Sequence, residues 1–316
     1  MGRRAGSLAA TVGLTLIIYA GAAAAADRPD FNVTFGPGYR VDDFSWSIAG
    51  TTSGTNPNIL SELTWRDNKI AELRGGGEVW LHDRPWGALV QLSYGQIVDG
   101  EVQDSDYAGD NRTGEFSRSF STPTGDTWGA DVGLAYRTRV YDSSVDKYAL
   151  LIFSAGYTWQ EQDLRAKEGV QVVPAYGPFS GLNTHYDTHW EGPWIGAQME
   201  FETGDDITLS LGIKYAWTDY SAEADWNLRD DLAHPVSFRH DATGGGTLVT
   251  AGLRRDLGPH WTFGALIEVR DWTTDAGVDR SYLVDSDTGA VFVADTRLNR
   301  VDWLSRSFSF QAQYRY

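Results

Sequence analysis

Cysteine is absent from the 316 residues of this chain. The sequence therefore offers no disulfide and no metal cluster built on Cys and His. An exported chain without cysteine must be stabilised by a route other than cross-linking.

Long hydrophobic runs are also missing, because no stretch after Asp27 approaches 18 apolar residues. The apolar run Leu8–Ala20 is too short to span roughly 30 Å of hydrocarbon as a helix. Two arginines precede it and the small residues Ala22–Ala26 follow it, which is the pattern of a secretory signal. We therefore predict a cleaved signal peptide of residues 1–26 and one mature domain of residues 27–316.

Basic residues are scarce, with 26 Lys and Arg against 43 Asp and Glu, for a net charge of −17. This balance argues against nucleic acid as a partner, since phosphate binding needs a basic surface. It favours cationic partners or divalent ions at acidic loops. The sequence holds no Gly-rich phosphate loop and no serine triad motif, so no organic cofactor is expected.

Aromatic residues and glycine are abundant, with 13 Trp, 15 Tyr, 13 Phe and 35 Gly. The segment Ile207–Trp217 is apolar or aromatic at every odd position, and small or polar at every even position. Period 2 over this length predicts a strand with one apolar face. The pattern recurs in Trp128–Arg137, Ile195–Glu202 and Trp261–Arg270.

The polar faces of these strands carry charges of both signs, at Asp131, Arg137, Glu200, Glu202, Lys214, Glu268 and Arg270. A soluble sandwich would turn them outward, whereas a membrane barrel turns them into its lumen. The expected signal peptide favours the barrel. So does the alternating terminus Phe308–Tyr316, which resembles the signal read by the barrel-assembly machinery of Gram-negative bacteria. We expect an outer-membrane protein with that machinery and outer-membrane lipid or lipopolysaccharide as partners.

Short and long connections alternate along the chain. Short turns are expected near 82–86, 142–147, 204–206 and 256–260, where Asp, Gly and Pro gather. Long polar segments are expected near 50–58, 100–125, 164–189, 222–238 and 272–297. Nine connections imply ten strands in one closed, antiparallel, all-β transmembrane barrel. Because bacterial barrels have short periplasmic turns, both termini are expected in the periplasm.

Several short motifs resemble the omptins, a family of ten-stranded outer-membrane proteases. Ile59–Trp65 is similar to the motif that opens the second omptin strand, and Tyr94-Gly95, Ala155–Tyr157, Pro193–Gly196 and Lys214–Trp217 follow in family order. The likeness covers nearly all of the chain from Asp30 to Tyr316 in length and element order. It implies the omptin fold.

The resemblance also implies where a protease site would lie. Omptins are described as cutting peptides next to basic residues, with an Asp-x-Asp pair and an Asp-x-His dyad across the barrel mouth. Asp104 and Asp106 match the first pair. The dyad positions read Ala224 and Trp226, and a shift of one residue offers Asp225 with Asn227. Neither alanine nor tryptophan accepts a proton, so this half of the site is missing.

Histidines elsewhere could replace the missing base. His185, His189 and His234 lie in the long polar segments nearest the expected mouth, although loop histidines are usually solvated polar residues. The family's lipopolysaccharide site is basic, but the matching positions here read Trp159, Glu161 and His189. Its basic character is largely missing.

A calcium loop is a further possibility. Asp104, Asp106, Asp110 and Glu115 have the spacing of EF-hand ligands, but no helices flank them and Ala108 occupies a ligand position. A solvated acidic loop explains them as well.

The expected lumen charges, which also include Arg74 and Glu78, are most simply a network that fills a wet, narrow interior. A wide pore is excluded by ten strands. Three functions remain: a non-catalytic surface, structural or adhesive barrel; an endopeptidase with an atypical dyad; and a small pore or ligand-binding barrel. We expect the first, and the sequence fixes no oligomeric state.

Overall fold

The computed structural model describes residues 30–142, 147–203 and 206–316. The expected signal peptide, residues 1–26, lies outside the described residues. Within these three ranges, no helix has the length and apolar character needed to cross a membrane.

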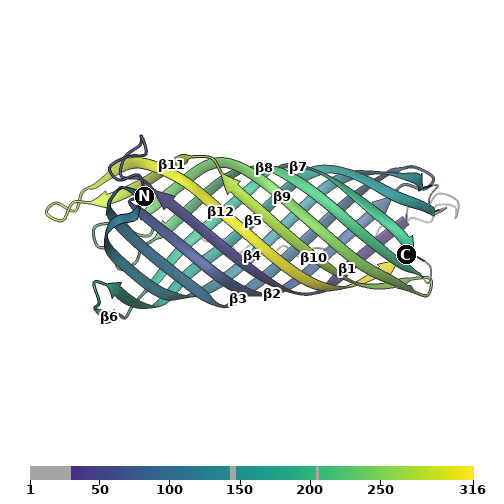
Figure 1. The fold of residues 1–316 in the computed structure, drawn as a ribbon, viewed down its shortest axis with the longest axis horizontal. Coiled ribbons are helices and arrows are strands. Elements are labelled where there is room, and N and C mark those ends of the chain that lie inside the picture. The colour runs from purple at the N-terminus through teal and green to yellow at the C-terminus, as the bar shows by residue number, and fades with distance from the viewer. Residues whose placement is uncertain (1–29, 143–146, 204–205) are drawn as a thin grey trace, which may run out of the picture.

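Ten long antiparallel strands form a closed ring, as expected from the sequence (Figure 1). They are β1 (Asp30–Ile48), β2 (Ser61–Trp80), β3 (Trp86–Gly109), β4 (Thr113–Asp142), β5 (Lys147–Val173), β7 (Asn183–Thr203), β8 (Ile207–Asp225), β9 (Phe238–Leu257), β10 (Trp261–Thr274) and β12 (Val291–Arg315). Each strand pairs with the next in this series, and β1 closes the ring on β12. The short β6 (Gly177–Pro178) pairs with β5, and β11 (Gly277–Val284) continues the wall beyond β10.

The two ends of the barrel differ in their connections. One end, here the turn end, carries the short turns, including Leu81–Pro85 and Gly258–His260. Asn32 lies opposite Arg315, so the first and last strand residues are at this end too. The other end, here the loop end, carries the connections 49–60, 174–182, 226–237 and 285–290, and β6 and β11 lie there (Figure 1).

The expected long polar segments near 100–125, 164–189 and 272–297 are largely strand, which corrects the prediction. β3 runs on to Gly109, and only the 3₁₀ turn Asp110–Arg112 separates it from β4. The reason is that the wall continues beyond its lipid-facing part. Beyond the membrane the outer face of each strand is polar, so these parts of the strands lack the apolar outer face by which the other parts were recognised.

An apolar band encircles the turn-end half of the barrel. On β8 the side chains of Leu209, Leu211, Ile213 and Tyr215 face outward, with exposed fractions of 40–57%. With the outward-facing Trp217 they span nine residues, which matches the roughly 9–11 residues that a tilted strand needs to cross a bilayer. Aromatic pairs such as Trp86–Tyr136 mark its turn-end border. This arrangement, apolar outside and polar inside, is that of a transmembrane barrel.

At the loop-end border of this band, the apolar side chains of the strands switch from the outer face to the inner face. On β8, outward Trp217 is the last residue of the apolar band, and the next large apolar side chain, Tyr220, is buried inside. Ala222 and Ala224 follow it inward, while Asp219 and Glu223 turn outward. Strand β7 does the same. The expectation of a polar lumen therefore holds only for the turn-end half.

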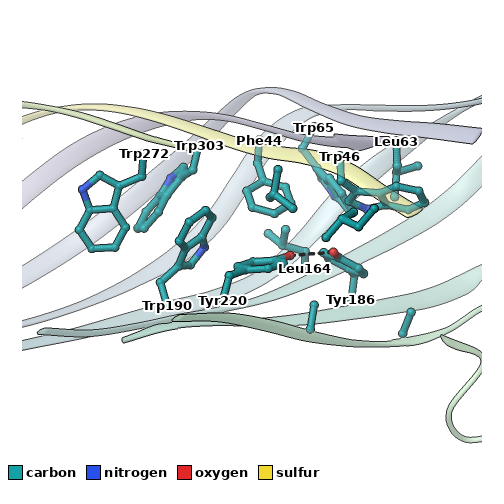
Figure 2. Packing of buried hydrophobic residues seen from close by; sticks show 14 of the residues in the cluster. Phe44, Trp46, Leu63, Trp65, Leu164, Tyr186, Trp190, Tyr220, Trp272 and Trp303 are labelled. Carbon is teal, nitrogen blue, oxygen red and sulfur yellow. Dashed lines mark hydrogen bonds between the residues drawn. The ribbon is translucent and has the colours of Figure 1, made fainter. Parts of the chain in front are cut away.

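The loop-end half of the lumen is filled by side chains (Figure 2). We call this cluster the aromatic core; its main members are Phe44, Trp46, Trp65, Tyr186, Trp190, Tyr220, Trp272 and Trp303. Trp190 lies 4.5 Å from Tyr220 and 5.8 Å from Trp272, measured between ring centroids. Glycine in the barrel wall makes room for the large rings of this cluster. A Cβ on Gly133 would lie 2.8 Å from the ring of Trp194, too close for any larger residue. Close-packed rings leave no open channel in this half.

Candidate functional site

Asp104 and Asp106 stand together at the loop end of the lumen. They are two residues apart on β3, opposite Leu63 and Ser61 of β2. Because Leu63 belongs to the buried core, the side chains that share its face point into the barrel. The sequence expectation that these two aspartates form a pair at the mouth agrees with this placement.

Each carboxylate has its own partners. Asp104 accepts a hydrogen bond from the indole N–H of Trp226, and Asp106 accepts bonds from the hydroxyls of Ser61 and Ser117. Arg229 provides a nearby positive charge for both. Its guanidinium is held by Asp231 through two contacts of 2.7 Å.

The environment of the pair raises the pKa of both carboxyls. Burial is the main cause, and the neighbouring Asp106 adds to it, so that the pKa of Asp104 rises to about 7. The pKa of Asp106 is raised by burial as well. The pair lies beyond the apolar band, at the loop end of the lumen. It can hold one proton between two carboxyls near neutral pH.

A pH dependence of stability follows. A raised pKa means that the folded state prefers the protonated carboxyl, so stability falls as the pH rises from about 4 to about 7. Asp104→Asn removes this loss. We expect the variant to gain on the wild type as the pH rises from about 4 to about 7, by up to about 3 kcal/mol. Denaturant unfolding of both proteins across this range measures the difference, and parallel pH profiles would contradict the prediction.

The residues opposite the acid pair are those expected at the dyad positions. Ala224 is buried and offers no proton acceptor. Trp226 packs against Phe238 with ring centroids 4.7 Å apart and donates to Asp104. Asp225, between them in the chain, turns to the outer face. The site thus joins two acids to an indole, where a protease of this kind would need a base.

The six histidines of the chain all lie within the described residues, and none contacts Asp104 or Asp106 there. His185, His189 and His234 are on the outer face, where His189 pairs with Glu161 at 3.1 Å and His234 with Asp225 at 2.6 Å. His185 lies beside the Asn183 amide. His82 and His260 are at the turn end. The sixth, His240, is buried in the aromatic core.

Trp159, Glu161 and His189 lie together on the outer wall. Trp159 packs on Tyr157, with ring centroids 4.7 Å apart, and Glu161 accepts the indole N–H of Trp128. The pairing of His189 with Glu161 leaves this patch without a free basic group.

The four calcium candidates do not converge. Asp104 and Asp106 face the interior, whereas Asp110 accepts the backbone N–H of Asn58 at 2.8 Å and Glu115 pairs with Arg118. In the part of the chain that the structure describes, no group of three or more His, Asp or Glu is arranged to hold a metal ion. An EF-hand loop wraps its ligands around one ion, whereas here β3 ends at Gly109, Asp110 lies in the following turn and Glu115 lies on the returning β4.

A chain of buried polar groups crosses the aromatic core, and no sequence pattern indicated it. The Tyr186 hydroxyl lies 2.7 Å from both the Tyr220 hydroxyl and Nδ1 of His240. Nε2 of His240 lies 3.3 Å from Asp279 Oδ1, and Asp279 Oδ2 accepts the Thr296 hydroxyl at 2.8 Å. Burial raises the pKa of both tyrosines, which keeps them protonated.

The turn-end half of the lumen holds the predicted mixed charges. Lys214 pairs with Asp131 at 2.8 Å, Arg254 with Glu200 at 2.5 Å, and Arg74 with Glu268. A cavity of about 150 Å³ lies among them. Of the predicted charges, Arg137 stacks over Trp80 near the turn end, and Glu202 is exposed.

Comparisons with known proteins identify the family of this chain. The family model described as Pom, Protochlamydia outer membrane protein, matches residues 34–316. The chain belongs to this family. The Pom match covers nearly the whole barrel, so this Pom protein is an outer-membrane barrel protein. Comparison with curated proteins finds no match.

Solved structures of other outer-membrane proteins resemble this fold. The outer membrane protease OmpT from Escherichia coli superposes on this Pom protein with a TM-score of 0.73 at 12% identity, over 93% of this chain and 99% of OmpT. The outer membrane protein OprG from Pseudomonas aeruginosa matches with a TM-score of 0.33 at 11% identity, over 92% and 97% of the two chains. The omptin-like fold expected from the sequence is confirmed, and identity this low shows the fold alone.

Proposed function

We propose that this protein is a non-proteolytic, non-conducting outer-membrane barrel that serves as a structural or surface-binding protein. One observation carries the proposal: the acid pair at the loop end meets the indole of Trp226, and the aromatic core fills the lumen behind it. Both halves of this arrangement bear on function, the first on catalysis and the second on transport.

Catalysis lacks its base. Hydrolysis by an activated water needs a group that takes the water's proton, within hydrogen-bond reach. Asp104 is already engaged by an indole N–H, and no histidine faces it in the described part of the chain. Loss of such a base costs on the order of 10²–10⁴ in rate, and more in a coupled pair.

Transport lacks a path. The aromatic core spans the lumen from β1 and β2 to β7, β8, β10 and β12, with ring centroids 4.5–6.3 Å apart. A solute could pass only if these rings moved. We therefore assign the barrel to the surface, with the loop end outside the cell and the short turns in the periplasm, as in other bacterial barrels.

The partners expected from the sequence remain part of this proposal. The apolar band and its aromatic borders support contact with outer-membrane lipid or lipopolysaccharide. The terminal strand, with Phe308, Phe310, Tyr314 and Tyr316 on one face, supports insertion by the barrel-assembly machinery. The acidic loop end favours cationic surfaces outside the cell.

Cleavage is the first test. Refolded protein is incubated with a peptide that contains paired Arg or Lys, beside OmpT as the active control. We expect no cleavage by this protein. Cleavage that disappears in both Asp104→Ala and Asp106→Ala would overturn the proposal, because it would show that the acid pair is catalytic.

Conductance is the second test. The protein is inserted in a planar bilayer, beside a porin of about 16 strands, whose lumen is a wide aqueous pore. We expect no single-channel steps from the closed barrel. Regular steps of uniform size from the wild-type protein would place it among the small pores instead.

A further inference from the structure

We propose that the cavity in the turn-end half of the lumen is a binding site for a small carboxylate, held by Arg270. This inference goes beyond the proposed function and does not depend on it, since a closed barrel can bind a solute that enters from the turn end.

The cavity is a built compartment rather than a gap between strands. Its volume of about 150 Å³ is room for on the order of ten water molecules, and it is well below the size of a drug-binding pocket. It extends from Thr262 and Gln313, near the turn end, to Arg270 and Gln160. The aromatic core begins directly beyond Arg270, at Trp272 and Trp303.

Every other cation of the inner lumen has a carboxylate partner. Arg74, Lys214 and Arg254 pair with Glu268, Asp131 and Glu200. Arg40 pairs with Glu72 at 3.0 Å and with Asp42 at 3.1 Å. These pairs neutralise most of the wall, as expected for charges in a narrow lumen.

Arg270 is different, because it forms no ion pair with any described residue. Its guanidinium lies over the rings of Trp272 and Trp303, at 4.9 and 4.6 Å from their centroids. One nitrogen donates to Gln160 Oε1 at 3.0 Å, and the buried Nε has no hydrogen-bond partner among the described residues. A fixed guanidinium with free donors, at the wall of a polar cavity, is arranged to receive an anion.

The chemistry of the wall favours a small carboxylate over other anions. The planar guanidinium matches a carboxylate with two parallel hydrogen bonds, which a spherical ion cannot form. The amides of Gln91, Gln198 and Gln311 line the same cavity and supply further donors. Glu78 lines it too, and in the described part of the chain its hydrogen-bond partner is the Trp80 indole. Its negative charge disfavours a ligand with more than one charge.

The test measures acetate binding to the refolded full barrel in detergent, by isothermal titration calorimetry at neutral pH and constant ionic strength. We expect a dissociation constant on the order of 1 mM for the wild type. Arg270→Met keeps most of the side-chain volume, and we expect it to weaken binding at least tenfold. Glu78→Gln is the matched control, because it removes a charge from the same wall, and we expect it to bind acetate as well as the wild type or more tightly.

Three outcomes would overturn the proposal: no acetate binding by the wild type, equal binding by Arg270→Met, or chloride binding as tight as acetate. Heat-modifiable mobility on a gel shows whether each variant is folded. If Arg270→Met does not fold, Arg270→Lys keeps the charge but loses the planar fork. We expect Arg270→Lys to bind acetate several-fold more weakly than the wild type, and unchanged binding would contradict the role of the guanidinium.

Discussion

Replacing Trp190 by alanine is expected to lower the free energy of unfolding by about 3–5 kcal/mol. The side chain is fully buried in the centre of the aromatic core, against Tyr220, Trp272 and Trp303. Alanine leaves a cavity among rings that are anchored on different strands and cannot close over it. The three lost ring contacts add to the loss of buried area.

The measurement is denaturant unfolding of the refolded barrel, followed by the gel shift between folded and unfolded forms. Trp217→Ala is the matched control, since Trp217 faces outward at the loop-end border of the apolar band and 47% of its surface is exposed. We expect a much smaller loss there. Trp190→Phe keeps a ring in the cavity and should fall between the two. Equal losses for Trp190→Ala and Trp217→Ala would show that the aromatic core does not stabilise the barrel.

The barrel itself could be predicted from the sequence, because its signal is local. Alternation in Ile207–Trp217 sets the strand and its apolar face. The expected signal peptide and the aromatic terminus then indicated that this face meets lipid. The number of connections then sets the number of strands. The ends of the strands could not be placed in this way, because a wall that rises into water no longer needs an apolar outer face.

The aromatic core is nevertheless visible in the sequence, as a shift of the apolar positions from odd to even numbers within one strand. On β8 the apolar positions are odd up to Trp217 and even from Tyr220 onward. A loop would show no such order, whereas a strand that leaves the membrane keeps its period and exchanges its faces. The same change occurs on β7, between Ile195 outside and Trp190 inside. Followed along each strand, it would have predicted the closed lumen.

The site was predictable only in part. Asp104 and Asp106 are neighbours in sequence, so their pairing could be inferred. The indole that meets them comes from Trp226, over a hundred positions later, and its role depends on the register of the whole ring. The lone charge of Arg270 is likewise visible only after every ion pair in the lumen is assigned.

The chain of buried groups around His240 gives the second large effect. His240→Phe is expected to lower the free energy of unfolding by about 1–3 kcal/mol, the cost of leaving a buried polar group without its partner, and by more if the group left behind is a carboxylate. The phenyl ring fits among Trp46 and Phe238, so packing is kept. The carboxylate of Asp279 is then buried without its partner.

A double-mutant cycle separates this from a simple loss of packing. Asp279→Leu alone should cost less than His240→Phe, because a neutral imidazole can stay buried and keeps its bond to Tyr186. In the double variant both polar partners are gone, so we expect it to be more stable than His240→Phe alone. Additive losses would contradict this account.

The outer face supplies the comparison within the same protein. His234 and Asp225 form an Asp–His pair at 2.6 Å, but both side chains are part-exposed to solvent. The matching variants His234→Phe and Asp225→Leu should each change the free energy of unfolding by less than about 1 kcal/mol, because water replaces the lost partner. Two pairs of the same chemistry thus differ in effect through burial alone. If the exposed pair were as costly to break as the buried one, burial in the aromatic core could not be the cause.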